Sequence, residues 1–257
     1  MNLSVIVPAY NEEERLPQMM LECTDFLEKR CRRDKSFSYE VIIADDGSKD
    51  STTKEGWKWS KQLGSDKVRV LTLKKNRGKG GAVRYGVLRA RGERILFADA
   101  DGATTFEDIK LLEKKMDDIE NEDGLGVVCG SRAHLQDESV AKRTLFRTIL
   151  MYGFHTCVTL FGAKSIKDTQ CGFKLFTRKA ARICFASLHI ERWAFDVELL
   201  KIAEMVGIPL GEVAVRWEEI DGSKLNPVLA SLQMFKDLFL LWLRYRVGAW
   251  RLKKRSD

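Results

Sequence analysis

The chain has 257 residues, of which 44% are hydrophobic and 32% are charged. This length and composition suffice for one large domain or for a domain with an appendage, and they exclude disorder, collagen and a small disulfide-stapled scaffold. The 44 Lys and Arg residues exceed the 37 Asp and Glu residues, which gives a formal net charge of +7. That total alone is compatible with nucleic acid, an anionic membrane or a phosphorylated substrate as partner.

Two hydrophobic periods alternate through the first half of the chain. Short β-branched runs predict strands, and longer segments with helical spacing lie between them. The predicted strands are Leu3–Pro8, Tyr39–Ala44, Val68–Leu73, Arg94–Ala98 and Gly126–Cys129, and the predicted helices are Glu12–Arg33, Ser51–Leu63, Gly80–Ala90 and Phe106–Ile119. This alternation predicts an α/β fold with a mostly parallel sheet covered by helices on both faces. In such sheets the ligand lies beyond the carboxyl ends of the strands.

The second half of the sequence is less regular. We expect a mostly apolar helix over Ala141–Phe161, a polar turn from Asp168 to Lys174, helices over Arg178–Phe185 and Phe195–Val206, a strand over Glu212–Trp217 and helices from Pro227 onward. A helix that spans a bilayer needs roughly 20 apolar residues, and no segment clearly meets this requirement. We therefore predict one domain over residues 1–227, followed by a basic, amphipathic extension over 228–257 that suits a membrane surface.

The excess positive charge lies entirely in the second half. Residues 1–127 carry 23 basic and 24 acidic side chains, and residues 128–257 carry 21 and 13. These basic residues interleave with apolar helix positions, and the acids that follow the strands would repel a polyanion in the absence of metal. Nucleic acid is therefore the least favoured partner.

Acidic pairs follow two of the predicted strands. Asp99 and Asp101 directly follow one strand, and Asp45 and Asp46 follow another. Two carboxylates separated by a small residue can face one cation, and Mg²⁺ and Mn²⁺ combine such oxygen ligands with substrate phosphates and water. We therefore expect a metal and diphosphate site at this edge of the sheet. The alternative is structural, with a turn at Asp101 and a helix cap at Asp99.

A basic, glycine-rich segment at residues 76–81 follows the third predicted strand. Glycine would let Arg77 and Lys79 approach a phosphate closely, and the alternative is a solvated basic loop. The segment does not match the dinucleotide-binding fingerprint, because Val83 stands where that motif needs glycine. It does not match a P-loop either, because Gly80 stands where that motif needs Ser or Thr. Arg132 also follows a predicted strand and is a further candidate for binding an anion.

Eight motifs stand at or near the predicted strand ends and in the second half. They are VPAYNE (7–12), DDGSKDST (45–52), NRGKGGAVR (76–84), DADGATT (99–105), GSRAHL (130–135), DTQCGFKLF (168–176), ERWAFDVELL (191–200) and DGSK (221–224). Together they resemble the family-2 glycosyltransferases of GT-A fold, most closely the members that glucosylate dolichyl phosphate, and the match extends over essentially the whole chain. The resemblance implies inverting, metal-dependent transfer of glucose from UDP-glucose to dolichyl or another polyprenyl phosphate. The metal would be Mg²⁺ or Mn²⁺, and residues 1–130 would bind the nucleotide sugar while 131–227 face the acceptor.

The resemblance also implies roles for individual residues. The donor would be bound by Pro8, Tyr10, Glu12, Asp46, Lys79, Asp99, Ala100 and Lys224. The catalytic residues would be Asp99, Asp101, Arg132 and Gln170, and the metal ligands would be Asp99, Asp101 and Gln170. Arg143 and Arg147, four residues apart and therefore on one helix face, would bind the acceptor phosphate. Because that phosphate is already anionic at neutral pH, we expect no strong general base and assign Asp168 and Asp196 to orienting or structural roles.

The resemblance further implies a membrane setting. The product would serve as glucose donor for lipid-linked oligosaccharide in N-glycosylation, at the cytoplasmic face of the endoplasmic reticulum membrane. Family members usually begin with a membrane-spanning segment, whereas this sequence starts directly before its first predicted strand. We expect either a truncated chain or attachment through the surface extension alone. The alternative functions are a polyprenyl-phosphate mannosyltransferase that uses GDP-mannose and a non-catalytic protein that binds nucleotide sugars.

Overall fold

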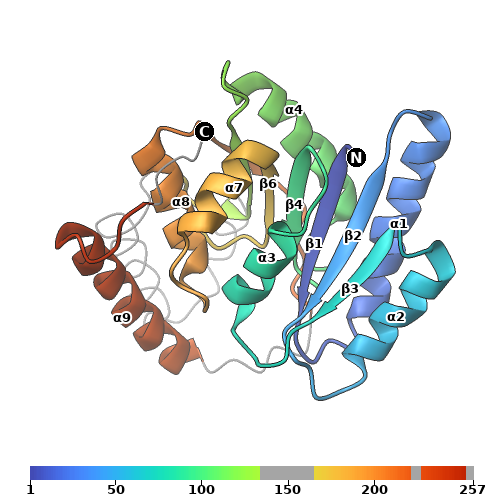
Figure 1. Ribbon diagram of the computed structural model, residues 1–257, viewed down its shortest axis with the longest axis horizontal. Helices are drawn as coiled ribbons and strands as arrows, with labels where there is room; N and C mark the ends of the chain where they lie inside the picture. Colours follow the sequence, from blue (N-terminus) through green and yellow to red (C-terminus); the bar gives the residue numbers. More distant parts are fainter. Residues whose placement is uncertain (134–164, 221–226, 253–257) are drawn as a thin grey trace, which may run out of the picture.

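The computed structural model describes residues 1–133, 165–220 and 227–252, and within them the strands form one seven-stranded sheet in the order β3-β2-β1-β4-β6-β5-β7 (Figure 1). The strands are β1 (Leu3–Ala9), β2 (Tyr39–Asp45), β3 (Val68–Thr72), β4 (Arg94–Ala98), β5 (Val127–Ser131), β6 (Phe173–Thr177) and β7 (Leu210–Ala214). Neighbouring strands pair in parallel except at β6, which runs antiparallel to β4 and β5. The predicted α/β fold with a mostly parallel sheet is confirmed.

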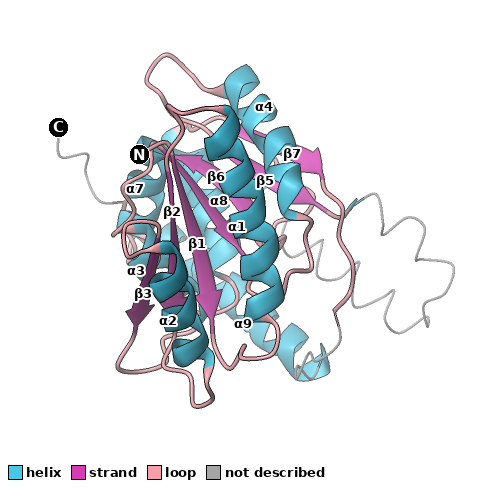
Figure 2. Cartoon of the chain, turned by 90° about the vertical axis from the view of Figure 1, so that its right-hand side faces the viewer, coloured by secondary structure: helices cyan, strands magenta, loops and turns pink. Residues whose placement is uncertain are grey.

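Helices cover both faces of this sheet. One face carries α1 (Leu16–Arg33), α2 (Thr52–Leu63), the short 3-10 helix η1 (Phe106–Asp108) and α4 (Ile109–Ile119), and the other carries α3 (Lys79–Val87), α7 (Arg178–Ser187) and α8 (Phe195–Val206). Successive side chains of a strand point to opposite faces of the sheet. In β1, Val5 and Val7 therefore pack on the side of α1 and α4, and Ile6 packs on the side of α3. In Figure 2, α1 and α2 lie in front of β1 and β2.

Local signals set the ends of the helices. The first helix begins at Leu16 rather than at the predicted Glu12, because Asn11 adopts a left-handed conformation (φ 56°) and Pro17, which lacks an N–H group, stands in the first helical turn. Further along the chain, α8 ends where Gly207 adopts the left-handed conformation (φ 72°) that commonly closes a helix.

The strand β6 corrects the predicted polar turn from Asp168 to Lys174. All five of its residues are buried between β4 and β5. A central strand with both faces buried shows no polar and apolar alternation, and Lys174, its second residue, further obscured the strand. The strand predicted over Glu212–Trp217 begins two residues earlier, at Leu210. The predicted helix over Ala141–Phe161 lies outside the described residues.

The last helix, α9 (Pro227–Arg246), packs against α8 at the side of the molecule (Figure 1). Met234 and Leu238 form a small cluster there with Ala194 and Val197. Among the described residues, no helix combines the length and hydropathy needed to cross a bilayer. The division into a domain over 1–227 and an extension over 228–257 stays a prediction.

A buried carboxylate ties together the amino ends of β1 and β2. Glu40 accepts hydrogen bonds from Ser4 Oγ (2.7 Å), from the Arg91 backbone N (2.7 Å) and Nε (2.8 Å), and from Arg69 Nη1 (2.9 Å). Burial alone would raise the pKa of Glu40, and these donors hold it below its ordinary value of 4.5. Because the buried charge is fully compensated, this cluster is structural.

We expect Glu40→Gln to lower the free energy of unfolding by about 2 kcal/mol at neutral pH, because the two arginines lose their buried partner. The pKa of Glu40 is lower in the folded than in the unfolded protein, so its stabilisation is present above about pH 4.5 and is lost as pH falls through the folded pKa. Urea unfolding of both proteins should therefore show a difference that shrinks between about pH 6 and about pH 3. A difference independent of pH would contradict this account.

Candidate functional site

The carboxyl ends of β1, β2 and β4 bring the predicted acidic residues to one edge of the sheet. Pro8 and Ala9 pair in register with Ala44 and Asp45 of β2. Burial raises the pKa of Glu12, Arg15 lowers it, and the charges of Asp101 and Asp99 raise it further. Residues separated by almost ninety positions therefore share one electrostatic environment, as the sequence predicted.

Asp99, directly after β4, pairs with a lysine of the glycine-rich segment. Lys79 Nζ lies 2.6 Å from Oδ1 and 2.8 Å from Oδ2, and it donates a hydrogen bond to Oδ2. Both oxygens therefore contact the Lys79 ammonium group, and the Asp99 side chain is still 32% exposed. A carboxylate can accept from several partners at once, so this group has capacity for a further cation.

Gly172 makes the space that this carboxylate occupies. The Asp99 backbone N donates to the Gly172 carbonyl oxygen (3.0 Å), so the two residues lie side by side. A Cβ atom at position 172 would lie only 2.0 Å from Asp99 Oδ2 and 2.2 Å from its Cγ. Sequence reasoning missed Gly172 because its place next to Asp99 depends on β6, which was predicted as a turn.

Asp101 forms the turn that was named as the structural alternative. Its Oδ1 accepts from Ala103 N (3.0 Å), and Gly102 adopts a left-handed conformation (φ 73°). The residues after the turn are tied to the chain beyond β7, because Glu218 N donates to Ala103 O (2.9 Å). The turn and a ligand role are compatible, since a carboxylate has a second oxygen.

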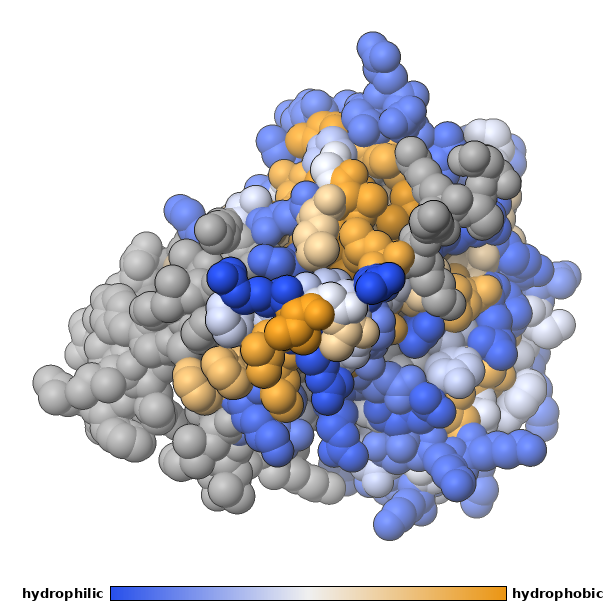
Figure 3. Space-filling view, turned by 60° about the vertical axis from the view of Figure 1, so that its left-hand side comes forward, coloured by the Kyte–Doolittle hydropathy of each residue, from blue (hydrophilic) through white to orange (hydrophobic). Residues whose placement is uncertain are grey.

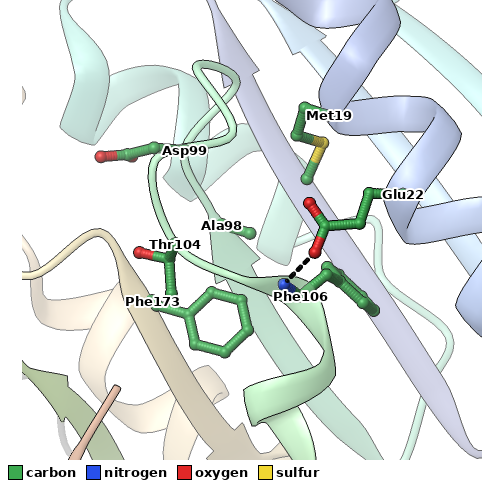
Figure 4. Close-up of a pocket in the computed structure, with 7 residues that line it drawn as sticks. All are labelled: Met19, Glu22, Ala98, Asp99, Thr104, Phe106 and Phe173. Carbon is green, nitrogen blue, oxygen red and sulfur yellow. Dashed lines mark hydrogen bonds between the residues drawn. The ribbon is translucent and has the colours of Figure 1, made fainter. Parts of the chain in front are cut away.

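A narrow pocket lies beside Asp99, between α1 and the loop that follows β4 (Figure 4). It is lined by Met19, Glu22, Ala98, Asp99, Thr104, Phe106 and Phe173. Glu22 Oε1 accepts the Phe106 N–H at 2.7 Å. Figure 4 shows the Asp99 carboxylate pointing away from Met19 and Glu22. The pocket therefore belongs to the support of the loop, and the carboxylate faces the opposite side.

Backbone amides compensate the adjacent acids after β2. Asp45 accepts from Ser48 N (2.9 Å) and from the Thr53 hydroxyl, and Asp46 accepts from Arg77 N and Gly78 N (both 2.7 Å). Burial raises the pKa of Asp46, and these two N–H groups oppose that rise. Both acids therefore hold loops at this edge of the sheet. The nucleoside-binding role of Asp46 stays a prediction.

Both bases of the glycine-rich segment are paired with carboxylates. Arg77 forms a bidentate ion pair with Glu191, in which Nη2 lies 2.6 Å from Oε1, and Lys79 pairs with Asp99. Burial alone would lower the pKa of Lys79, but the charges of Asp99 and Asp196 raise it. Lys79 is therefore held charged at the acidic edge.

Arg132, at the end of β5, is fixed by Asp168. Its Nε and Nη2 lie 2.7 and 2.9 Å from the two carboxylate oxygens, and its backbone N donates to the same group. Burial alone would raise the pKa of Asp168, and Arg132 lowers it. Asp168 thus orients Arg132, the role expected for it from the sequence.

The remaining predicted residues are placed less fully. Gln170 Nε2 lies 3.9 Å from Met234 Sδ of α9. Tyr10 is exposed, and Pro8 and Ala100 are buried. Arg143, Arg147 and Lys224 lie outside the described residues.

A second buried ion pair stands behind the site. Lys174 Nζ lies 2.6 Å from Asp196 Oδ1 and donates to the Cys171 carbonyl oxygen, and neither side chain reaches solvent to more than 5%. Burial alone would lower the pKa of Lys174, but Asp196 raises it. The pair suits the structural role expected for Asp196. No local pattern indicated Lys174 as its partner, since the two residues come from β6 and α8.

Comparison with known proteins extends this picture over the whole chain. The model of the family "Glycosyl transferase family 2" matches residues 4–184. The chain is 60% identical over 253 residues to the dolichyl-phosphate beta-glucosyltransferase of Homo sapiens, covering 98% of this chain and 78% of that protein. It is 58% identical over 255 residues to the protein of that name from Drosophila melanogaster, with the same coverage.

Solved structures share the fold at much lower identity. Glucosyl-3-phosphoglycerate synthase from Mycobacterium tuberculosis, in complex with Mn²⁺, UDP and phosphoglyceric acid, has a TM-score of 0.61 and 18% identity, covering 96% of this chain and 78% of that one. The family match covers well over half of the sequence and agrees with the fold and the acidic strand ends. The chain therefore belongs to glycosyl transferase family 2.

Proposed function

We propose that this glycosyltransferase moves glucose from UDP-glucose to dolichyl phosphate or another polyprenyl phosphate, with inversion at the anomeric carbon. The observation that carries the proposal is the 60% identity over nearly the whole chain to the human dolichyl-phosphate beta-glucosyltransferase. The acidic edge with Lys79 and Arg132 supports it, because it combines oxygen ligands for a metal with cations for phosphates.

A divalent metal, Mg²⁺ or Mn²⁺, fits the residues at Asp99 and Asp101. The partly exposed Asp99 carboxylate can accept a cation in addition to Lys79, and Gly172 leaves that carboxylate its space. No group of three His, Cys, Asp or Glu side chains suited to a metal occurs in the described part of the chain. Further ligands would therefore come from the donor diphosphate, water and Gln170. When bound, the metal would supply positive charge to the leaving diphosphate.

The reaction would be a direct displacement. An oxygen of the acceptor phosphate forms a bond to C1 of glucose while the bond from C1 to the β-phosphate oxygen of UDP breaks, and its electron pair leaves with UDP. Attack on the face opposite the α-linked UDP gives a β-linked product. A phosphate monoester has a second pKa of about 6. The acceptor phosphate is therefore an anion at neutral pH and needs no strong base to act as the nucleophile. Asp168 and Asp196, each held in an ion pair, then have orienting roles.

The exposed face of α9 supports contact with a membrane surface. Met234, Leu238 and Leu241 are buried, whereas Phe235 and Phe239 are 51% and 42% exposed. Figure 3, which brings this side forward, shows hydrophobic and hydrophilic residues intermingled on it. Exposed aromatics accompanied by basic residues suit a helix lying in the headgroup region of anionic lipid. We place this surface at the cytoplasmic face of the endoplasmic reticulum membrane, where dolichyl phosphate would be the acceptor.

The proposal predicts the products of a donor and acceptor panel. The full chain should convert UDP-glucose and a short polyprenyl phosphate into glucosyl polyprenyl phosphate, and EDTA should abolish turnover until Mg²⁺ or Mn²⁺ is restored. Mass spectrometry identifies the lipid, and NMR its anomeric configuration. Preference for GDP-mannose would contradict the donor assignment. UDP-glucose binding without turnover on any polyprenyl phosphate would instead indicate a non-catalytic binding protein.

The proposal also predicts how α9 contributes to lipid binding. Phe235→Ser with Phe239→Ser should reduce flotation with anionic liposomes about fivefold or more, because two aromatic side chains would no longer enter the interface. Leu21→Ser with Leu111→Ser is the matched control, since these side chains of α1 and α4 are similarly exposed. Flotation equal to wild type for the α9 variant would exclude α9 as the contact surface.

A further inference from the structure

The segment at residues 76–81 is held between two carboxylates that come from different parts of the chain. On one side, Asp46 accepts the N–H groups of Arg77 and Gly78, both at 2.7 Å. On the other side lies Glu191, in the loop between α7 and α8, 114 positions from Arg77 in the sequence. Asp46 belongs to the predicted donor site, whereas Glu191 has had no assigned role.

Glu191 contacts this segment with both its side chain and its backbone. The side chain accepts from Arg77 Nε at 3.0 and 2.9 Å and from Nη2 at 2.6 Å, which is the bidentate geometry of a strong arginine–carboxylate pair. The carbonyl oxygen of Glu191 accepts Gly81 N at 3.0 Å. Two independent bonds therefore fix the segment at both of its ends.

The glycines of the segment are shaped to this contact. A Cβ at Gly78 would lie 2.7 Å from the Glu191 carbonyl oxygen, and a Cβ at Gly80 would lie 2.5 Å from the Cβ of Phe195. These glycines thus allow the backbone to approach the loop that carries Glu191. Close approach to a phosphate, the reason suggested by the sequence, is not needed to explain them.

The contacts of Asp46 and Glu191 with residues 76–81 also position Lys79, the basic residue of this segment that pairs with Asp99. Lys79 lies in the middle of residues 76–81, and its Nζ reaches both oxygens of Asp99. A small displacement of this segment would withdraw Lys79 from the carboxylate and the two N–H groups from Asp46. Misplacement by even about 1 Å can be costly where charges must be preorganised.

We propose that Glu191 is a positioning residue for the nucleotide. Its ion pair with Arg77 fixes residues 76–81. This keeps Lys79 in contact with Asp99 and keeps the backbone N–H groups of Arg77 and Gly78 at Asp46. This inference rests on the proposed function, since it assumes that the acidic edge binds a nucleoside diphosphate.

The test is a double-mutant cycle on UDP binding in the presence of Mn²⁺, measured by calorimetry on the full chain. Glu191→Gln should weaken UDP binding about fivefold, the size expected for a partly exposed bidentate pair. Arg77→Gln should have the same effect, and the double variant should be no weaker than either. In turnover, the KM for UDP-glucose should rise while the KM for the polyprenyl phosphate stays unchanged.

Hydrogen exchange of the apoprotein gives a second readout that needs no ligand. Amide exchange at residues 76–81 should be faster in Glu191→Gln than in wild type. The matched control is Glu113→Gln, because Glu113 pairs with Arg30 at 2.7 Å with similar exposure but joins α1 to α4. That variant should leave UDP binding and the exchange of residues 76–81 unchanged.

Several results would overturn the inference. Wild-type UDP affinity in Glu191→Gln, or tighter binding, would show that Glu191 does not position the segment or that it competes with the diphosphate for Arg77. A much larger loss in Arg77→Gln than in Glu191→Gln would make Arg77 itself the nucleotide contact. A wild-type protein that binds no UDP would contradict the proposed function, while the exchange measurement would still decide whether Glu191 holds the segment.

Discussion

The site depends on the contact between the Asp99 carboxylate and Gly172. That contact exists because β6 enters the sheet antiparallel between β4 and β5, so that the residue preceding β6 meets the residue following β4. The space at Gly172 is occupied by carboxylate oxygens and leaves no room for a side chain. Lys79 Nζ lies 2.6 Å from an oxygen of this carboxylate. The single reversal of strand direction therefore creates the acidic centre rather than only completing the sheet.

Carboxylates at the two edges of the sheet are compensated differently. At the amino edge, Glu40 accepts from a hydroxyl, a backbone amide and two arginines, so its charge is compensated within the protein. At the carboxyl edge, the Asp99 side chain is 32% exposed and pairs with Lys79. A fully paired buried charge indicates structure, whereas a partly exposed carboxylate beside a cation has room for a ligand. This contrast supports the carboxyl edge as the donor site more directly than acidic composition does.

Sequence reasoning succeeded where local patterns decide the structure. Alternating periods located the parallel strands, and strand-end positions placed Glu12, Asp99 and Asp101 together, because parallel strands end at the same edge. It failed where contacts join distant segments. Nothing near Arg77 in the sequence points to Glu191, and nothing near Asp196 points to Lys174. The strand β6 was missed because a central strand has no polar face. The role of Gly172 was missed because its contact with Asp99 depends on the position of β6 in the sheet.

We propose that the space at Gly172 leaves the Asp99 carboxylate where a metal and a nucleoside diphosphate would bind. The most direct measurement is the titration of Mn²⁺ in the presence of UDP, followed by electron paramagnetic resonance, for wild type and Gly172→Ala. The account predicts binding weakened about tenfold or more in Gly172→Ala, because the new methyl group would displace the carboxylate. Gly211→Ala in β7 should bind as wild type, since its Cβ would meet mainly flexible side-chain ends. A folded Gly172→Ala protein with wild-type Mn²⁺ affinity would contradict the account.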